Sequence, residues 1–147
     1  MRPGVRLAVD VGTVRIGVAK SDALGMLASP LETIPRGDGD AARVAAIAAE
    51  WDAIEIYVGL PKALSGRTTA STEDAIGFAH ALAAIWAGEV RFVDERLTTV
   101  TASERLHAAG RNARRQRRVI DQAAATIILE SALESERRTG GQPGTRV

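Results

Sequence analysis

Three acidic residues stand at positions where a carboxylate is unexpected, and together they could hold divalent cations. Asp10 ends the apolar stretch VRLAVD, and Glu95 follows the apolar stretch VRFVD. Asp121 begins the row 121, 125, 128 and 132, whose other members are Ala, Ile and Ala at helical spacing. Ligand sets made only of oxygen suit Mg²⁺ or Mn²⁺. Two such ions about 4 Å apart can hold a phosphodiester, activate a water and stabilise the leaving oxygen.

Each acid also has a purely structural interpretation. Asp10 could cap the turn VGT that follows it, because acids are common in turns, and its position alone does not decide. Glu95 could be a surface acid paired with the arginine that follows it. Asp121 could complement a helix dipole from the first turn, but that role would not require a place on the packing face, which favours function. Asp94 competes with Glu95, and only one of these neighbours can share a face with Asp10, because side chains alternate along a strand.

A run of basic residues precedes Asp121. Six arginines and no acid lie in this segment: Arg105, Arg111, Arg114, Arg115, Arg117 and Arg118. Guanidinium groups suit phosphate better than ammonium groups do, although charge runs are more often solvated surface loops. The net charge of the whole chain is only +1, which does not by itself indicate a nucleic-acid partner.

The composition is that of a soluble globular protein. The chain has 147 residues, of which 46% are hydrophobic and 25% are charged, and this length predicts one domain. No long uncharged apolar run predicts a membrane span, and the chain enters a strand too early to leave room for a signal peptide. Without cysteine there is neither a disulfide nor a thiolate metal site. We therefore expect a cytoplasmic protein with no membrane partner.

The periodicity of apolar residues predicts alternating strands and helices. The expected strands are 5–10, 15–20, 26–34, 55–60 and 90–94, and the expected helices are 40–51, 72–86, 98–109 and 119–137. The first two strands form a hairpin, and Pro30 argues that the third is an edge strand or bulged. This order predicts an α/β fold with a five-stranded mixed sheet, helices on both faces and the topology of an RNase H-like domain. Residues 1–137 would form the domain, and residues 138–147 a flexible tail.

Four segments in order resemble the YqgF-type nucleases, also called the RuvX type. They are VDVGTVRIGVAKSD (9–22), VGLPKALSGR (58–67), VDERLTT (93–99) and IDQAAATIIL (120–129). The resemblance covers nearly the whole chain, from about residue 5 to residue 135. Members of this family are RNase H-like proteins described as pre-16S ribosomal RNA nucleases or as Holliday-junction resolvase homologues.

The resemblance implies a divalent-metal-dependent endonuclease whose catalytic and metal-binding acids are Asp10, Glu95 and Asp121, with Mg²⁺ or Mn²⁺ as cofactor. It also implies a substrate-binding set from the Gly-Leu-Pro loop, the Asp-Glu-Arg box and the arginine run. This set comprises Gly59, Pro61, Lys62, Arg67, Arg96, Thr98, Thr99, Arg111, Arg114, Arg115, Arg117 and Arg118. The Gly-Leu-Pro loop could equally be an ordinary connection between a strand and a helix.

The expected partner is structured nucleic acid, most simply a precursor of 16S ribosomal RNA during ribosome biogenesis. A four-way DNA junction in recombination or repair is the alternative, and the residues do not separate RNA from DNA. Symmetric cutting of a junction would need a homodimer rather than a monomer. Two further hypotheses are a non-catalytic module that binds nucleic acid or the ribosome, and a relative of the actin-like ATPases. The first is disfavoured by three acids facing a phosphate backbone, and the second by the missing second phosphate hairpin.

Overall fold

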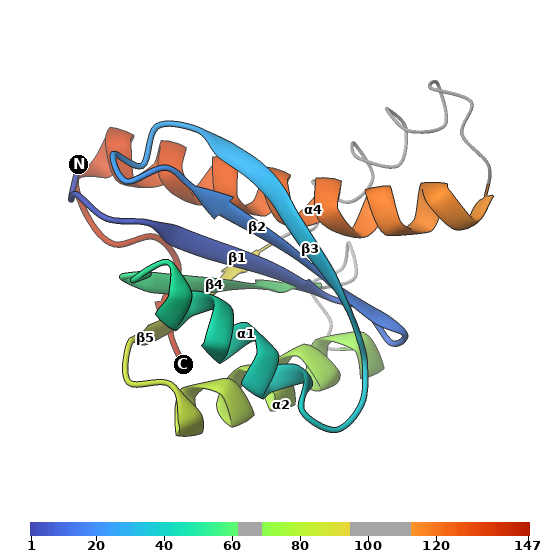
Figure 1. Cartoon of the computed structure of the whole chain (residues 1–147). Coiled ribbons are helices and arrows are strands. Elements are labelled where there is room, and N and C mark those ends of the chain that lie inside the picture. Colours follow the sequence, from blue (N-terminus) through green and yellow to red (C-terminus); the bar gives the residue numbers. More distant parts are fainter. Residues whose placement is uncertain (62–68, 95–112) are drawn as a thin grey trace.

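The apolar strands assemble into one mixed sheet in the computed structural model, which describes residues 1–61, 69–94 and 113–147, with side chains of the last helix from residue 120 onward. The chain runs β1 (Arg6–Val11), β2 (Arg15–Ser21), β3 (Ala28–Pro35), α1 (Asp40–Glu50), β4 (Glu55–Leu60), α2 (Ala70–Ile85), β5 (Glu89–Asp94), α4 (Ala113–Thr139) and β6 (Thr145–Arg146). The sheet order is β3-β2-β1-β4-β5-β6. Figure 1 shows α4 crossing one face of this sheet, with α1 and α2 on the other.

The sheet has an antiparallel half and a parallel half. β1 and β2 form the predicted hairpin, and β3 continues it as an antiparallel edge strand. β1, β4 and β5 run parallel to one another. The carboxyl ends of three strands therefore meet at one edge of the sheet, which is where open α/β sheets usually place a site.

Pro30 lies in an edge strand and also beside a bulge, the two alternatives that the sequence predicts. It lies in the edge strand β3, where a missing backbone N–H costs no ladder bond on the solvent side. The register between β2 and β3 also shifts beside it: Val18 pairs with Glu32, whereas Ala19 pairs with Pro30. Leu31 is thus the extra residue of a β-bulge.

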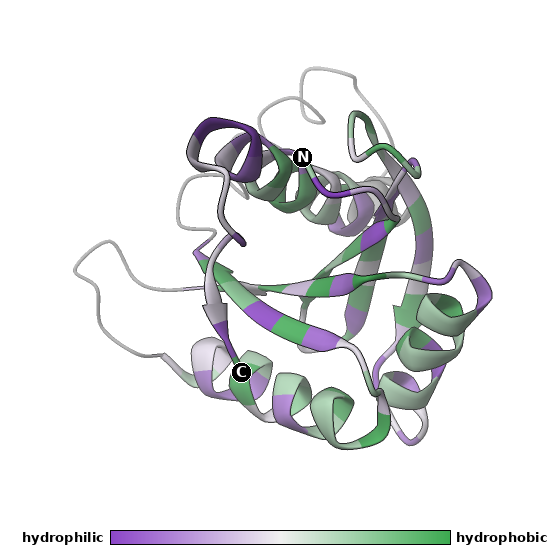
Figure 2. Ribbon diagram, turned by 90° about the vertical axis from the view of Figure 1, so that its left-hand side faces the viewer, coloured by the Kyte–Doolittle hydropathy of each residue, from purple (hydrophilic) through white to green (hydrophobic). Residues whose placement is uncertain are grey.

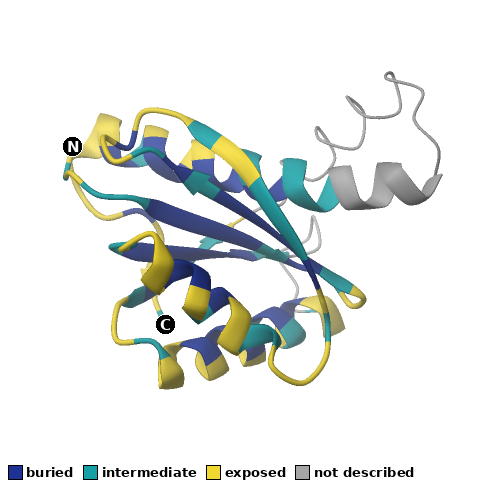
Figure 3. Ribbon diagram, in the orientation of Figure 1, coloured by how far each residue is buried: buried dark blue, intermediate teal, exposed yellow. Residues whose placement is uncertain are grey.

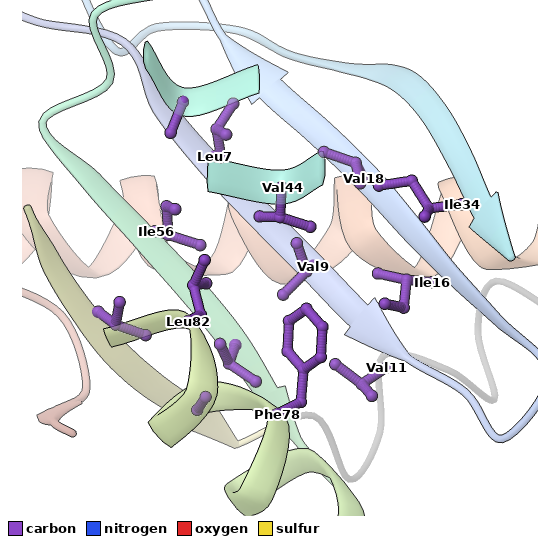
Figure 4. Close-up of a cluster of buried hydrophobic side chains, with 14 of the residues drawn as sticks. Leu7, Val9, Val11, Ile16, Val18, Ile34, Val44, Ile56, Phe78 and Leu82 are labelled. Atoms are coloured by element: carbon purple, nitrogen blue, oxygen red, sulfur yellow. The ribbon is translucent and has the colours of Figure 1, made fainter. Parts of the chain in front are cut away.

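Two hydrophobic clusters hold the helices to the sheet. One lies between the sheet and the pair α1 and α2, on the face that we call the α1/α2 face; Figure 4 shows Val9, Phe78 and Leu82 within it. The other lies under α4, on the α4 face, and includes Tyr57 and Leu129. Figure 2 shows these layers from the side, and Figure 3 shows that the buried residues concentrate in the strands and on the inward sides of the helices. Helices on both faces are therefore confirmed.

The prediction of five strands is wrong by one, because the C-terminal segment adds β6 to the edge of the sheet. Thr145 pairs with Phe92 and Arg146 with Arg91, antiparallel to β5. The Arg91 side chain donates to the carbonyl oxygens of Pro143, at 2.6 Å, and Gly144, at 2.9 Å. The composition of residues 138–147 predicted a flexible tail. Residues 145–146 instead form a strand, because the exposed edge of β5 supplies hydrogen-bond partners that composition cannot reveal.

The last helix also begins earlier than expected, at Ala113 rather than at residue 119, and continues to Thr139. The helix expected over 98–109 lies outside the described residues. Within the described ranges, none of the helices is both long and apolar enough to cross a membrane.

A buried ionic network ties the start of the chain to the end of α4. The Arg6 side chain, with none of its surface exposed, donates to Glu136 Oε2 at 2.8 Å and to the Gly4 carbonyl oxygen at 2.8 Å. Arg2 bridges Glu136 and Glu55, and it donates to Glu55 Oε2 at 2.6 Å. Burial would raise the pKa of both glutamates, but the hydrogen bonds and charges of their arginine partners outweigh it, so both pKa values lie below normal.

This network should make the protein lose stability in acid. A carboxyl group whose pKa is lower in the folded chain binds fewer protons there than in the unfolded chain. Its contribution is therefore present above the unfolded pKa of about 4.3 and is lost as the pH falls through the folded value. We expect the melting temperature to fall steeply below about pH 4. Melting curves between about pH 7 and about pH 3 measure this loss for the native chain and for Glu136→Gln, whose decline should be shallower. Parallel declines would contradict a role for Glu136.

Candidate active site at the carboxyl edge of the sheet

Asp10 lies within β1 rather than in the turn that follows it. Its partner across the hairpin is Gly17, and it is half-buried. Ala8 and Ala19 pair with each other in the same ladder and both belong to the cluster under α4. Because side chains two residues apart share a face, Asp10 and Gly17 also lie on the α4 face.

Gly17 lets the backbone of α4 rest directly on the sheet at Asp121. A Cβ placed on Gly17 would lie 2.0 Å from the carbonyl oxygen of Asp121 and 2.9 Å from the backbone nitrogen of Gln122. No side chain fits at such distances, so only glycine permits this contact. Since Gly17 is the partner of Asp10, the same contact brings two of the three predicted acids to neighbouring positions.

The helical row that singled out Asp121 is confirmed as the packing face of α4. Ala125, Ile128 and Ala132 are buried in the cluster under this helix. Asp121 lies more than two turns after the helix begins at Ala113, so a first-turn role with the helix dipole is excluded. Its carboxylate accepts a hydrogen bond from Arg15 Nε at 2.9 Å. Burial raises the pKa of Asp121, and the hydrogen bond and charge of Arg15 offset that rise only in part.

The carboxyl end of β5 lies at the same edge of the sheet as Asp10. Gly59 of β4 is the register partner of Val93 in β5. Val93 packs against the cluster under α4, whereas Phe92 packs against the cluster on the α1/α2 face. Asp94 ends β5 and lines a pocket together with Ser131 and Ser135 of α4. Glu95, the acid that the sequence analysis grouped with Asp10, lies outside the described residues.

Arg36 holds the hairpin turn beside the two acids. It donates from Nη1 to the Gly12 carbonyl oxygen at 2.8 Å and to Asp74 Oδ2 at 2.6 Å, while its Nε donates to Asp40 Oδ2 at 2.9 Å. The turn after β1 is thus fastened to the starts of α1 and α2. Neither Arg36 nor Gly17 nor Arg15 was among the predicted site residues; the only signal for the last two was their place in the segment VDVGTVRIGVAKSD.

The remaining predicted residues divide into two groups. Gly59 and Pro61 lie at the carboxyl end of β4, and the Pro61 carbonyl oxygen accepts a hydrogen bond from Thr72 in the capping box of α2. Six of the others lie outside the described residues: Lys62, Arg67, Arg96, Thr98, Thr99 and Arg111. For the remaining four only the backbone is described, within α4: Arg114, Arg115, Arg117 and Arg118. Among the described residues no group of three acidic or histidine side chains could hold a metal ion, and the third predicted acid is not among them.

The sheet order and its helices define the class of protein. The structure superposes on RuvC from Thermus thermophilus with a TM-score of 0.56 and 15% sequence identity, over 97% of this chain and 99% of that one. RuvC of the same organism in complex with a Holliday junction substrate gives a TM-score of 0.59 at 13% identity, over 98% and 99% of the chains. At this identity the likeness establishes the fold alone, and the fold is RNase H-like, as predicted.

The particular family follows from the sequence. The family described as RuvX, Holliday junction resolvase, matches residues 4–135, and the chain belongs to it. A protein of Clavibacter sepedonicus named "Putative pre-16S rRNA nuclease" is 57% identical over all of this chain and 93% of its own length. A protein of the same name from Thermobifida fusca is 52% identical over all of this chain and 98% of its own length. The resemblance to the YqgF-type nucleases is thereby confirmed.

Proposed function

We propose that this protein is a divalent-metal-dependent endonuclease that hydrolyses phosphodiester bonds in structured nucleic acid. The contact that places Asp121 over Gly17, the strand partner of Asp10, is the observation that carries the proposal. It sets Asp10 and the backbone of Asp121 at neighbouring positions, at the sheet edge where three parallel strands end. A folding role alone gives no reason to collect half-buried acids there, because like charges repel in a medium of reduced dielectric.

Asp10, Asp121 and Glu95 would hold Mg²⁺ or Mn²⁺. The described residues fit such an ion by their ligand type: Asp10 and Asp121 offer carboxylate oxygens, Asp10 is half-buried, and the Asp121 side chain is 18% exposed. The bound ions would supply an activated water and stabilise the leaving oxygen. The chain's own contribution is to fix the acids on rigid elements, Asp10 on β1 and Asp121 on α4.

The basic residues of the loops and of the first part of α4 would bind the nucleic-acid backbone. Arg114, Arg115, Arg117 and Arg118 precede Asp121 on the same helix. We assign phosphate contacts to them together with Arg111, Lys62, Arg67 and Arg96, and backbone contacts to Thr98, Thr99 and the Gly59–Pro61 segment. Contacts of this kind position the substrate without reading its sequence, so affinity should decrease with salt.

The substrate that we favour is the 5′ region of precursor 16S ribosomal RNA, acted on in the cytoplasm during ribosome biogenesis. Relatives between 49% and 57% identical, matched over nearly their whole length, carry the name of a pre-16S rRNA nuclease. The second candidate is a four-way DNA junction, favoured by the family's description and by the fold shared with RuvC. Junction resolution would additionally require a homodimer that offers two sites.

The proposal predicts that Asp10→Asn abolishes cleavage. The wild-type chain and the variant are compared with Mn²⁺ on a precursor 16S rRNA 5′ segment and on a synthetic four-way junction. We expect the variant's rate to be at background, because one of the acids that hold the ions is gone. Asp38→Asn, a change at an exposed acid in the loop before α1, is the matched control and should cleave normally.

The choice of substrate then follows from the product. Cleavage of the RNA alone would assign the chain to ribosomal RNA maturation, and paired symmetric nicks in the junction would assign it to resolution. A wild-type protein that never exceeds Asp10→Asn on either substrate, while still binding both, would contradict the nuclease proposal and support a non-catalytic binding module.

A further inference from the structure

We propose that Arg15 has two simultaneous contacts at this site: it positions Asp121 through Nε and binds a phosphate of the nucleic acid through its terminal nitrogens. The inference rests on the proposed nuclease function, and it adds a substrate-binding residue that lies outside the arginine run and the loops.

Arg15 lies on the α4 face of the sheet, and the hydrogen bonds of its backbone fix its position there. It begins β2, its carbonyl oxygen accepts a hydrogen bond from the Gly12 nitrogen at 2.8 Å, and it pairs with Pro35 of β3. Because it is two residues from Gly17, its side chain belongs to the α4 face. The guanidinium therefore extends from the hairpin to Asp121 of α4, on the side of β2 that borders β3.

Among the described residues, Arg15 uses only one of its side-chain donors. This donor is Nε, which donates to Asp121 Oδ2 at 2.9 Å. The side chain is 28% exposed, more than the 18% of Asp121. It also lines a shallow pocket with Thr33, Pro35 and Gln122, between β3 and α4. A guanidinium has five N–H donors in a planar fork, so one edge can hold a carboxylate while the other meets a phosphate.

A purely structural role explains this arrangement poorly. A partly exposed ion pair contributes about 0–1 kcal/mol to stability. Arg36, close to the same turn, shows what a structural arginine does here, since its nitrogens are distributed over Asp40, Asp74 and the Gly12 carbonyl oxygen. Arg15 instead places one positive charge beside Asp121 and keeps 28% of its side-chain surface exposed, which would lower the repulsion between this acid and an approaching phosphate.

The test measures how many phosphates the protein contacts. Binding of a fluorescently labelled four-way junction and of a labelled RNA stem is followed by anisotropy between about 50 and 200 mM salt, with Mn²⁺ present and cleavage blocked by Asp10→Asn. In that background Arg15→Ala should reduce the slope of log affinity against log salt by about 0.9 on duplex DNA, the loss of one phosphate contact. Affinity at low salt should fall about tenfold, the change that about 1.4 kcal/mol produces.

Two comparisons separate this role from a structural one. Arg43→Ala removes an arginine that is bound at 2.7 Å to Glu32 on the outer surface, and it should leave the slope unchanged. Arg15→Lys keeps the charge but not the fork, so it should keep the slope, whereas cleavage by the chain with Asp10 intact should fall about tenfold or more because one ammonium cannot hold both partners in place.

Equal slopes for Arg15→Ala and its parent would overturn the phosphate contact, and full cleavage by Arg15→Lys would overturn the positioning role. If Arg15→Ala does not fold, Arg15→Gln carries the same slope comparison. Failure of the proposed function is distinguishable: a wild-type chain that cleaves nothing, with a slope that still depends on Arg15, would remove the nuclease assignment and leave the phosphate contact.

Discussion

Replacing Glu136 with leucine should lower the free energy of unfolding by about 3–5 kcal/mol. The Arg6 guanidinium is completely buried, and Glu136 is its carboxylate partner at 2.8 Å. Leucine would leave that charge with the Gly4 carbonyl oxygen and no counter-ion, and a buried charge without a partner is far more costly than the ion pair is favourable. The loss is a large part of the roughly 5–15 kcal/mol that stabilises a typical domain.

Chemical denaturation with urea measures this loss, and the same helix offers a matched control. Glu134 pairs with Arg137, and its side chain is 61% exposed. Glu134→Leu should therefore change stability by less than about 1 kcal/mol. The double variant Arg6→Met with Glu136→Leu should recover most of the loss, since it removes the buried charge together with its partner. Equal losses for Glu136→Leu and Glu134→Leu would show that the buried network does not hold α4 to the sheet.

Replacing Gly17 with alanine should both destabilise the protein and strongly reduce cleavage. The new methyl group would lie 2.0 Å from the Asp121 carbonyl oxygen and 2.2 Å from its carbonyl carbon. Both atoms belong to the helix backbone and cannot rotate away, so α4 must move off the sheet. We expect a loss of about 1–3 kcal/mol or more from overpacking. Because Asp121 moves with the helix, cleavage should fall about a hundredfold, as misplacement by about 1 Å can produce.

Gly77 is the matched control for this prediction. It lies exposed in α2, and a Cβ there would meet no atom within 4 Å. Gly77→Ala should therefore stabilise the protein by about 0.5–1 kcal/mol, the usual gain in a helix interior, and leave cleavage intact. Rates are compared at a temperature where circular dichroism shows every variant folded. A folded Gly17→Ala protein that cleaves at the wild-type rate would separate the helix contact from the placement of the acids.

The features that the sequence alone determined are those written in short-range patterns. Alternation predicts the hairpin of β1 and β2 and the strand 55–60, whose bounds the structure reproduces. Pro30 predicts an edge strand or a bulge because it lacks an N–H, and it has both. The period of 3.6 residues predicts that Asp121 shares a face with Ala125 and Ile128, because any helix places such residues together whatever it packs against.

Only the tertiary structure decided which distant residues meet. Arg15 and Asp121 are 106 positions apart, and Arg6 and Glu136 are 130 apart. Neither pair has a local signature, because its geometry depends on where α4 crosses the sheet. The same holds for β6, whose two residues form a strand only because the edge of β5 is there to pair with. The sequence alone showed three acids at positions where a carboxylate is unexpected. The packing of α4 on Gly17 decided that two of them, Asp10 and Asp121, lie at neighbouring positions.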